Sequence, residues 1–252
     1  MRQLINFADK KIVVLGASSG IGKETAIILS SLGAQVIIVA RRKEKLEETL
    51  ALLEGNGHAY CATDISIPEN IEELFKKIKE EQGEIDGLVY CAGVNTTLPL
   101  MQLKPEKLKA TFDLNFFAFI ETVRQATKRG RYNPGMRIVA VSSNAAIRGD
   151  KAHTAYSASK AAMNAAIRCL AKELADKEIY INAVAPAVTN TEIYQQYAFG
   201  DVGGSEKALL KRQYLGLIEP SNVADAIAFL LSPAAQMITG ITLPVDGGLS
   251  TN

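Results

Sequence analysis

KIVVLGASSGIG, residues Lys11 to Gly22, decides the fold class of this chain. After Lys11, its next four residues are apolar and mostly β-branched, which is typical of a strand buried on both faces. A glycine-rich turn follows at once, and a helical pattern of apolar residues continues to Gly33. The free N–H groups and the dipole at the start of such a helix attract an anion. The stretch therefore predicts a phosphate cradle, and a tight turn without a ligand is the alternative.

The glycines of this turn have separate predicted roles in binding a dinucleotide. Gly16 permits the tight turn, Gly20 lets the backbone approach a pyrophosphate, and Gly22 lets the helix pack closely on the strand. The spacing is Gly-x-x-x-Gly-x-Gly, which differs from the more common Gly-x-Gly-x-x-Gly. Cofactor contacts are predicted for Gly16, Ser18, Ser19, Gly20, Ile21 and Gly22.

The end of the second predicted strand, residues 35–40, indicates which dinucleotide binds. NAD sites usually place an acidic residue there, roughly 20 residues beyond the glycine turn. This chain has Arg41 and Arg42 instead, and guanidinium groups bind a 2′-phosphate through charge-assisted bonds. The pair favours NADP over NAD. For Arg42, a surface position before the helix predicted over 43–53 stays open as the alternative.

Strands and helices alternate along the whole sequence. Further strands are predicted at 58–62, 88–91, 136–141, 179–184 and 242–245, and further helices at 68–82, 105–129, 153–175 and 221–231. This order predicts an α/β protein with a doubly wound Rossmann fold. We expect a single domain over residues 1–252, with about seven parallel strands and helices on both faces. Ligands of such a sheet lie at the carboxyl ends of the strands.

The strongest chemical signal lies between Ser142 and Lys160. A predicted strand ends in Ser142-Ser143, Tyr156 comes thirteen residues after Ser143, and Lys160 four residues after Tyr156. Positions i and i+4 of a helix share one face, so the phenol and the ammonium should project together. Such a pair predicts a proton donor.

With Asp64, Ala92-Gly93, Asn115, Pro186 and the terminal Asp246-Gly-Gly added, the chain resembles a short-chain dehydrogenase/reductase over nearly its whole length. The resemblance implies a catalytic tetrad of Asn115, Ser143, Tyr156 and Lys160. It also implies further cofactor contacts, which are Asp64, Ile65, Cys91, Ala92, Gly93, Tyr156, Lys160, Pro186, Thr189 and Thr191.

The chemistry of ketone reduction needs these residue types. The alkoxide formed by hydride transfer must be protonated, and a free phenol has a pKa of about 10. Lys160 and a positive nicotinamide ring would lower the pKa of Tyr156. Ser143 can donate to the carbonyl oxygen, and Asn115 is expected to anchor a water that links Lys160 to solvent.

The chain departs from the family pattern at three places. Cys91 stands where an Asn is usual, Ala187 where a Gly follows the proline, and Leu15 where Thr is frequent. Ala187 is tolerable only if its φ is negative. We expect these departures to affect cofactor affinity more than the fold.

Composition narrows the class of protein. The 252 residues are 48% hydrophobic and 22% charged, with a net charge of +1, which gives no electrostatic case for nucleic acid or an anionic membrane. No apolar run is long enough to span a membrane and no signal peptide is recognisable, so a cytoplasmic location is expected. Cys61, Cys91 and Cys169 are interpreted as reduced core residues, and no metal site is predicted.

The substrate is less well defined by the sequence. Residues 190–217 carry Tyr194, Tyr197, Phe199 and Tyr214, and predict a lid over a partly apolar small molecule. The favoured hypothesis is an NADP(H)-dependent oxidoreductase that interconverts a ketone and a secondary alcohol, resembling the 3-oxoacyl-carrier-protein reductase branch, with a carrier-bound substrate left open. The alternatives are a sugar, polyol or hydroxysteroid dehydrogenase and, from another class, a non-catalytic NADP-binding sensor or scaffold. His153 is interpreted as a surface residue at a helix start, with substrate contact as the alternative.

Small residues on the Tyr156 helix predict assembly. Ala158, Ala162, Ala165 and Cys169 form a stripe at helical spacing that allows close approach of another helix. Since the equivalent helix commonly packs on its symmetry mate in this family, we expect a homo-oligomer, a tetramer. Packing within the chain is the alternative.

Overall fold

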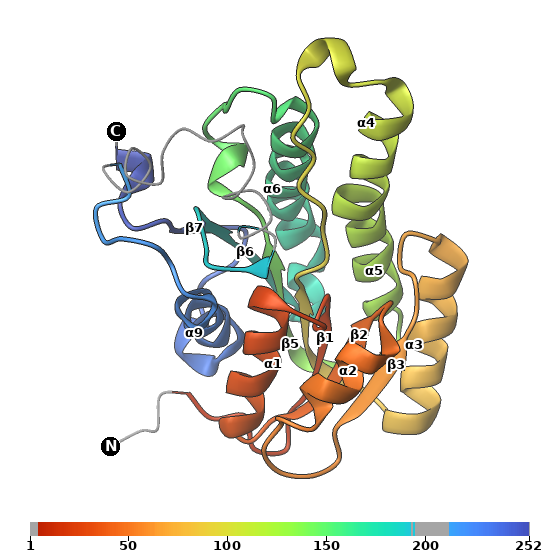
Figure 1. Cartoon of the computed structure of the whole chain (residues 1–252). Coiled ribbons are helices and arrows are strands. Elements are labelled where there is room, and N and C mark those ends of the chain that lie inside the picture. Colours follow the sequence, from red (N-terminus) through yellow and green to blue (C-terminus); the bar gives the residue numbers. More distant parts are fainter. Residues whose placement is uncertain (1–4, 193, 195–211, 252) are drawn as a thin grey trace.

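The computed structural model describes residues 5–192, 194 and 212–251 (Figure 1). The predicted lid lies partly outside these residues, including Tyr197 and Phe199. Within the described part of the chain, no helix is long and apolar enough to cross a membrane.

Seven parallel strands form one sheet in the order β3-β2-β1-β4-β5-β6-β7. The strands are β1 (Lys11–Leu15), β2 (Gln35–Ala40), β3 (Ala59–Ala62), β4 (Ile85–Tyr90), β5 (Tyr132–Val141), β6 (Tyr180–Pro186) and β7 (Thr242–Val245). The order reverses between β1 and β4, which is the topological switch point of a doubly wound sheet. The predicted fold class is confirmed.

Helices cover both faces of the sheet (Figure 1). One apolar core lies under α1 (Gly20–Ser31), α2 (Lys43–Leu50) and α9 (Pro220–Leu231). The other lies under α3 (Pro68–Gln82), α5 (Ala118–Ala126) and α6 (Thr154–Leu174). The central strands are buried on both sides, which explains their continuous apolar sequences.

The helix predicted over 105–129 is not uniform. It consists of α4 (Pro105–Phe112), a π-helical turn (Asp113–Phe117) and α5. A π turn inserts one extra residue into the helical path, and such turns are frequent at functional sites. Asn115 lies in the middle of this turn. The helix predicted over 43–53 is also shorter, ending at Leu50.

The face of α6 that carries Tyr156 and Lys160 is placed as expected, whereas one of the three cysteines is not. Tyr156, Lys160, Met163 and Ile167 share the face toward the sheet, and the last three are buried. The prediction that all three cysteines are core residues is wrong, because Cys169 is exposed while Cys61 and Cys91 are partly buried. Cys169 lies on the outer face of α6 with Ala158 and Ala165, which are exposed as well.

Candidate active site

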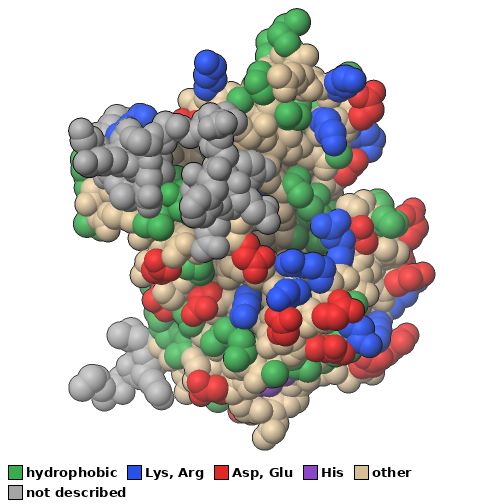
Figure 2. Space-filling view, in the orientation of Figure 1, with side chains coloured by type: hydrophobic (Ala, Val, Ile, Leu, Met, Phe, Trp, Pro, Cys, Tyr) green, Lys and Arg blue, Asp and Glu red, His purple; other side chains and the backbone are tan. Residues whose placement is uncertain are grey.

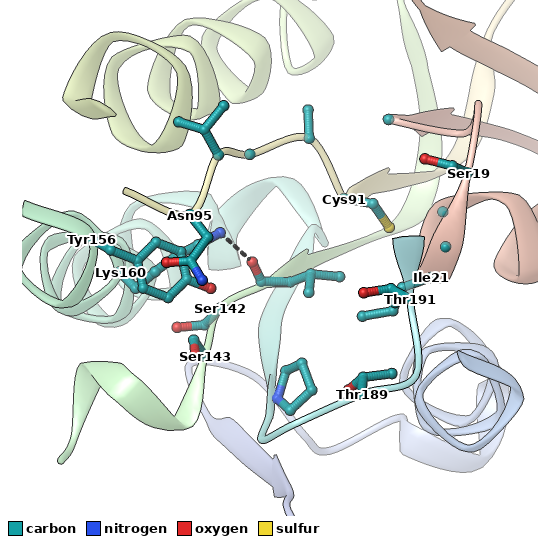
Figure 3. A pocket seen from close by; sticks show the side chains of 18 of the residues that line it. Ser19, Ile21, Cys91, Asn95, Ser142, Ser143, Tyr156, Lys160, Thr189 and Thr191 are labelled. Atoms are coloured by element: carbon teal, nitrogen blue, oxygen red, sulfur yellow. Dashed lines mark hydrogen bonds between the residues drawn. The ribbon is translucent and has the colours of Figure 1, made fainter. Parts of the chain in front are cut away.

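A cavity of about 900 Å³ lies at the carboxyl ends of the strands. It is lined by every residue predicted from the sequence to bind cofactor, and by Ser143. Figure 3 shows that these side chains come from elements far apart in the sequence: Ser19 and Ile21 from the glycine turn, Ser142 and Ser143 after β5, and Tyr156 and Lys160 from α6. Asn115 is the one predicted residue outside this lining, because it is fully buried.

The geometry of the glycine turn explains its spacing. Gly16 has a φ of +86°, and a Cβ there would lie 2.6 Å from the backbone N of Ala92. Gly22 packs against the carbonyl of Gly16, and a Cβ on Gly22 would also lie 3.1 Å from Cβ of Cys91. Both positions exclude a side chain. Gly20 has a φ of +54°, and a Cβ there would lie 3.3 Å from the Thr191 methyl group, so the turn and Thr191 are neighbours on the cavity wall.

The basic pair after β2 lies beside the glycine turn. The Arg42 guanidinium donates to the hydroxyls of Ser18 and Ser19, both at 3.2 Å. Arg42 therefore lines the cavity, and it is also an exposed residue directly before α2, so both interpretations of this position stay open. Arg41 is exposed and lies 4.0 Å from the Asp64 carboxylate. Figure 2 shows the hollow on this face, with basic side chains gathered along its lower side.

Asp64 has a stable negative charge at this edge of the cavity. Partial burial acts to raise the pKa of its carboxyl, but hydrogen bonds from the backbone and hydroxyl of Ser66, and the charge of Arg41, lower the pKa below its usual value overall. The carboxylate pairs with Arg41 and helps to fix that side chain over the end of β2.

Tyr156 and Lys160 lie together on the cavity wall (Figure 3). The Lys160 ammonium is 6.0 Å from the centre of the Tyr156 ring and donates to the Val141 carbonyl at 2.7 Å. Burial lowers the pKa of Lys160 to about 8. Burial also raises the pKa of the Tyr156 phenol, and a hydrogen bond with Ser143 acts in the opposite direction. In the chain alone the pKa of Tyr156 is therefore raised, and its expected lowering by Lys160 and a positive nicotinamide ring stays a prediction.

Asn115 works as a cross-link between three elements. Its amide nitrogen donates to the Val94 carbonyl and to the Ser159 hydroxyl, each at 3.0 Å, and its amide oxygen accepts from Val94 N at 2.8 Å. A Cβ on Gly93 would lie 3.1 Å from that oxygen and 3.4 Å from the Lys160 ammonium. Asn115 thus fixes the loop after β4 against α6, next to Lys160. Its predicted role in a water link stays a prediction.

The departures from the family pattern are accommodated. Cys91 lines the cavity, and burial raises the pKa of its thiol to about 12, so it is an inert packing group. Ala187 is not among the described residues with positive φ, which meets the condition set by its side chain. Leu15 is fully buried in the core under α3 and α6.

The sequence did not single out several polar residues of the catalytic end. The cavity lining includes Asn95, Asn144, Arg148 and Asp150, as well as His153. His153 immediately precedes α6 and bonds Thr97 at 3.1 Å, so it belongs both to the helix start and to the cavity. The only available sequence signal was position, since all follow the ends of β4 or β5.

These residues fit a nicotinamide dinucleotide. The glycine turn leaves room for a close backbone approach, and serine hydroxyls and a guanidinium surround the adjoining space. A family model described as Enoyl-(Acyl carrier protein) reductase matches residues 16–250. The chain belongs to the short-chain dehydrogenase/reductase family. Members are oxidoreductases acting on CH–OH and ketone groups, and this chain is one of them.

Curated members of this family match at full length. An L-xylulose reductase of Caenorhabditis elegans is 39% identical, with 98% of each chain covered. The 3-oxoacyl-[acyl-carrier-protein] reductase of Vibrio cholerae is 33% identical, covering 97% of this chain and 99% of the other. An NAD-dependent glycerol dehydrogenase of Listeria innocua is 35% identical, with 96% and 94% covered.

A solved structure agrees with the fold of this chain. A short-chain dehydrogenase from Burkholderia cenocepacia in complex with NADP superposes with a TM-score of 0.90 at 28% identity, covering 97% of this chain and 99% of the other. The relatives thus share the family and differ in substrate and in nicotinamide cofactor.

Proposed function

We propose that this short-chain dehydrogenase/reductase uses NADP(H) to interconvert a ketone and a secondary alcohol. One observation carries the proposal: Ser143, Tyr156 and Lys160 lie in the same cavity as the Arg42–Ser18–Ser19 cluster. One end offers a proton donor and the other offers donors for a phosphate. The NADP complex of the Burkholderia relative supports this cofactor, and the NAD-dependent Listeria relative is the reason for testing it.

The residues of this chain have definite roles in the proposed reaction. Ser143 and Tyr156 would hold the carbonyl oxygen, since both side chains line the same part of the cavity wall (Figure 3). A nicotinamide cofactor held in this cavity would supply the hydride for the reduction. The Tyr156 hydroxyl gives its proton to the resulting alkoxide oxygen, which completes the alcohol. Lys160, fixed by the Val141 carbonyl, lies close enough to stabilise the phenolate that remains.

The catalytic part of the proposal is tested with Tyr156→Phe. NADPH oxidation is followed over a panel of ketones, and NADPH binding is measured in parallel by fluorescence. We expect binding within about 2-fold of wild type and a loss of at least about 100-fold in kcat, which is the range of general acid catalysis. A variant that reduces ketones as fast as wild type would overturn the role of Tyr156. NADPH binding without turnover of any ketone by wild type would favour the sensor or scaffold.

The cofactor is tested at the two arginines. Because charge-assisted bonds to a phosphate carry the discrimination, Arg42→Ala and Arg41→Asp should each weaken NADPH binding by about 10-fold or more and leave NADH binding within about 2-fold. Arg168→Ala is a control for the loss of a guanidinium, because Arg168 lies on α6 outside the cavity lining. Equal losses for the two cofactors would exclude a 2′-phosphate site here.

A polyhydroxylated ketone is the substrate class that the cavity favours. Asn95, Asn144, Arg148, Asp150 and His153 offer donors and acceptors at the catalytic end, and the Caenorhabditis relative is an L-xylulose reductase. The Vibrio relative favours a 3-oxoacyl thioester instead. Comparing kcat/KM for a pentulose with that for an acetoacetyl thioester decides between them. Preference for the thioester by 10-fold or more would reverse the assignment.

The homotetramer and the cytoplasmic location are also parts of this proposal. The stripe Ala158, Ala162, Ala165 and Cys169 faces outward or is half-exposed in the single chain, which supports packing on a second copy. Light scattering of wild type and of Ala165→Glu tests this. We expect wild type to be tetrameric and the variant to dissociate at least to dimers, and a monomeric wild type would refute the prediction.

A further inference from the structure

The chain beyond β7 forms a closed turn, Asp246–Thr251, called here the C-terminal turn. Gly247 and Gly248 have φ values of +58° and +88°, a region that favours glycine. They reverse the chain so that the Asp246 carboxylate accepts from Gly248 N at 3.0 Å and from Ser250 N at 2.8 Å. The Asp-Gly-Gly sequence thus builds a turn that is closed by its own first residue.

The same carboxylate reaches the loop that carries the catalytic serine. Oδ2 of Asp246 accepts a hydrogen bond of 3.1 Å from the side-chain amide of Asn144, which follows Ser143 directly. Ser143, Asn144 and Asp246 are each less than a tenth exposed. A buried bond to a charged acceptor is stronger than one between neutral groups. Asn144 is thereby fixed at a point 102 residues away in the sequence.

A second contact fixes the other end of this loop. Arg148 donates to the Leu249 carbonyl of the C-terminal turn at 2.8 Å, and Leu249 itself lines the cavity. The turn is packed on its other side as well, where Leu215 N donates to Gly247 O at 3.2 Å. A Cβ on Gly248 would lie 2.8 Å from the Tyr214 ring. The C-terminal turn is therefore a fixed support for residues 144–148.

The orientation of the Ser143 hydroxyl depends on this loop. Ser143 ends the extended path of β5 and its hydroxyl accepts from Ala145 N at 3.1 Å, inside the short 3₁₀ turn Asn144–Ala146. The same hydroxyl acts to lower the pKa of the Tyr156 phenol, and both side chains line the cavity (Figure 3). A shift of the 3₁₀ turn would carry the Ala145 N–H with it and rotate Ser143 away from Tyr156.

We propose that Asp246 is a positioning residue for Ser143, acting through Asn144 and the C-terminal turn. Asp246 does not line the cavity and touches no reacting atom. The inference rests on the proposed function, because Ser143 must be a donor to the carbonyl for its position to matter.

The test begins with Asp246→Ala and Asn144→Ala. Asn144→Ala removes the link alone and leaves the bonds that close the C-terminal turn, so it remains informative if Asp246→Ala unfolds. We expect kcat to fall by about 10-fold or more, with NADPH affinity within about 2-fold of wild type, since small misplacements of a catalytic group have effects of this order. Asp86→Ala is the matched control. It removes a carboxylate bonded to Lys10 Nζ, Lys11 N and the Asn133 amide at the opposite end of the strands.

Two readouts separate positioning from a general loss of structure. In a Ser143→Ala background, Asp246→Ala should change kcat by less than about 2-fold, because residues that act through one another are not additive. In alcohol oxidation, Asp246→Ala should shift the pH–rate profile to higher pH, as Ser143→Ala does, and Asp86→Ala should not. Equal losses of kcat in both backgrounds, or an unmoved profile, would overturn the proposal.

Hydrogen exchange distinguishes this failure from failure of the proposed function. The Ala145 and Ala146 amides bond to Ser143 and should exchange faster in Asp246→Ala than in wild type or Asp86→Ala. If wild type reduces no ketone, the proposed function fails, and faster exchange still establishes the link. Unchanged exchange would refute the link itself.

Discussion

Replacing Lys160 with methionine should remove the part of the pH dependence of stability that comes from this buried ammonium group. Lys160 is buried, and its pKa is lowered from 10.5 to about 8 by that burial. The folded pKa lies below the unfolded one, so the unfolded chain binds the proton more tightly. Wild-type stability should therefore rise between pH 8 and 10.5 and be lowest below pH 8, where both states are protonated.

The magnitude follows from the two pKa values. A difference of about 2.5 pKa units corresponds to about 3 kcal/mol at pH 7, and to about 1.5 kcal/mol at pH 9.5. Against this, Lys160→Met loses the bond to the Val141 carbonyl and leaves that oxygen buried, which costs about 1–3 kcal/mol at every pH. The two effects nearly cancel at pH 7. The informative quantity is thus the change with pH.

The change of stability with pH is measured by urea unfolding of both proteins at pH 7, 8, 9 and 9.5. All titrations use one protein concentration and no cofactor. The stability of wild type relative to Lys160→Met should rise by about 1.5–2 kcal/mol over this range, as other groups titrate equally in both proteins. Lys172→Met is the control, since Lys172 is exposed near the end of the same helix and should show no such rise. A difference that stays constant with pH would show that Lys160 titrates normally in the folded protein.

Three further predictions concern the cavity wall. Gly22→Ala should lower the free energy of unfolding by about 1–3 kcal/mol and weaken NADPH binding, because a Cβ there meets the Gly16 carbonyl. The control is Gly149→Ala, because a Cβ at that position has nothing within 4 Å. This control should change stability by less than about 0.5 kcal/mol in the same urea titration. Iodoacetamide followed by mass spectrometry should label exposed Cys169 first and Cys91 only on unfolding, since burial raises the pKa of Cys91 to about 12; early labelling of Cys91 would contradict this. Ser143→Ala should shift the alcohol-oxidation profile to higher pH, because the bond from Ser143 lowers the pKa of Tyr156; a shift to lower pH would refute that reading.

Regular elements were predictable from local pattern alone. The apolar runs of β1, β2 and β7 and the helical pattern of α3 match the expected ranges, because parallel strands and amphipathic helices are largely specified by their own residues. The positions of Tyr156 and Lys160 on α6 were predictable for the same reason. The contact of the Arg42 guanidinium with Ser18 and Ser19 of the neighbouring glycine turn, in contrast, is visible only in the three-dimensional structure.

Other features depend on partners that sequence spacing does not reveal. The π turn at Asn115 interrupts a stretch whose composition suits a continuous helix. The one signal in the sequence was an asparagine in the interior of the predicted helix. Cys169 belongs to the stripe of small residues on α6, and this stripe faces away from the sheet because Met163 and Ile167 are the residues that pack on it. The bond from Asn144 to Asp246 joins two turns whose sequences say nothing of each other.

The environment of Tyr156 relates the fold to the direction of the reaction. Reduction of a ketone needs a protonated phenol, and oxidation of an alcohol needs a phenolate. Burial raises the pKa of Tyr156, which favours the protonated phenol further. Ser143 acts against burial, and the position of Ser143 depends on the loop that Asn144 and Asp246 fix. In the proposed mechanism, the pH range in which each direction is fast therefore depends on the residues around the phenol, with burial acting to extend reduction to higher pH and Ser143 acting in the opposite direction.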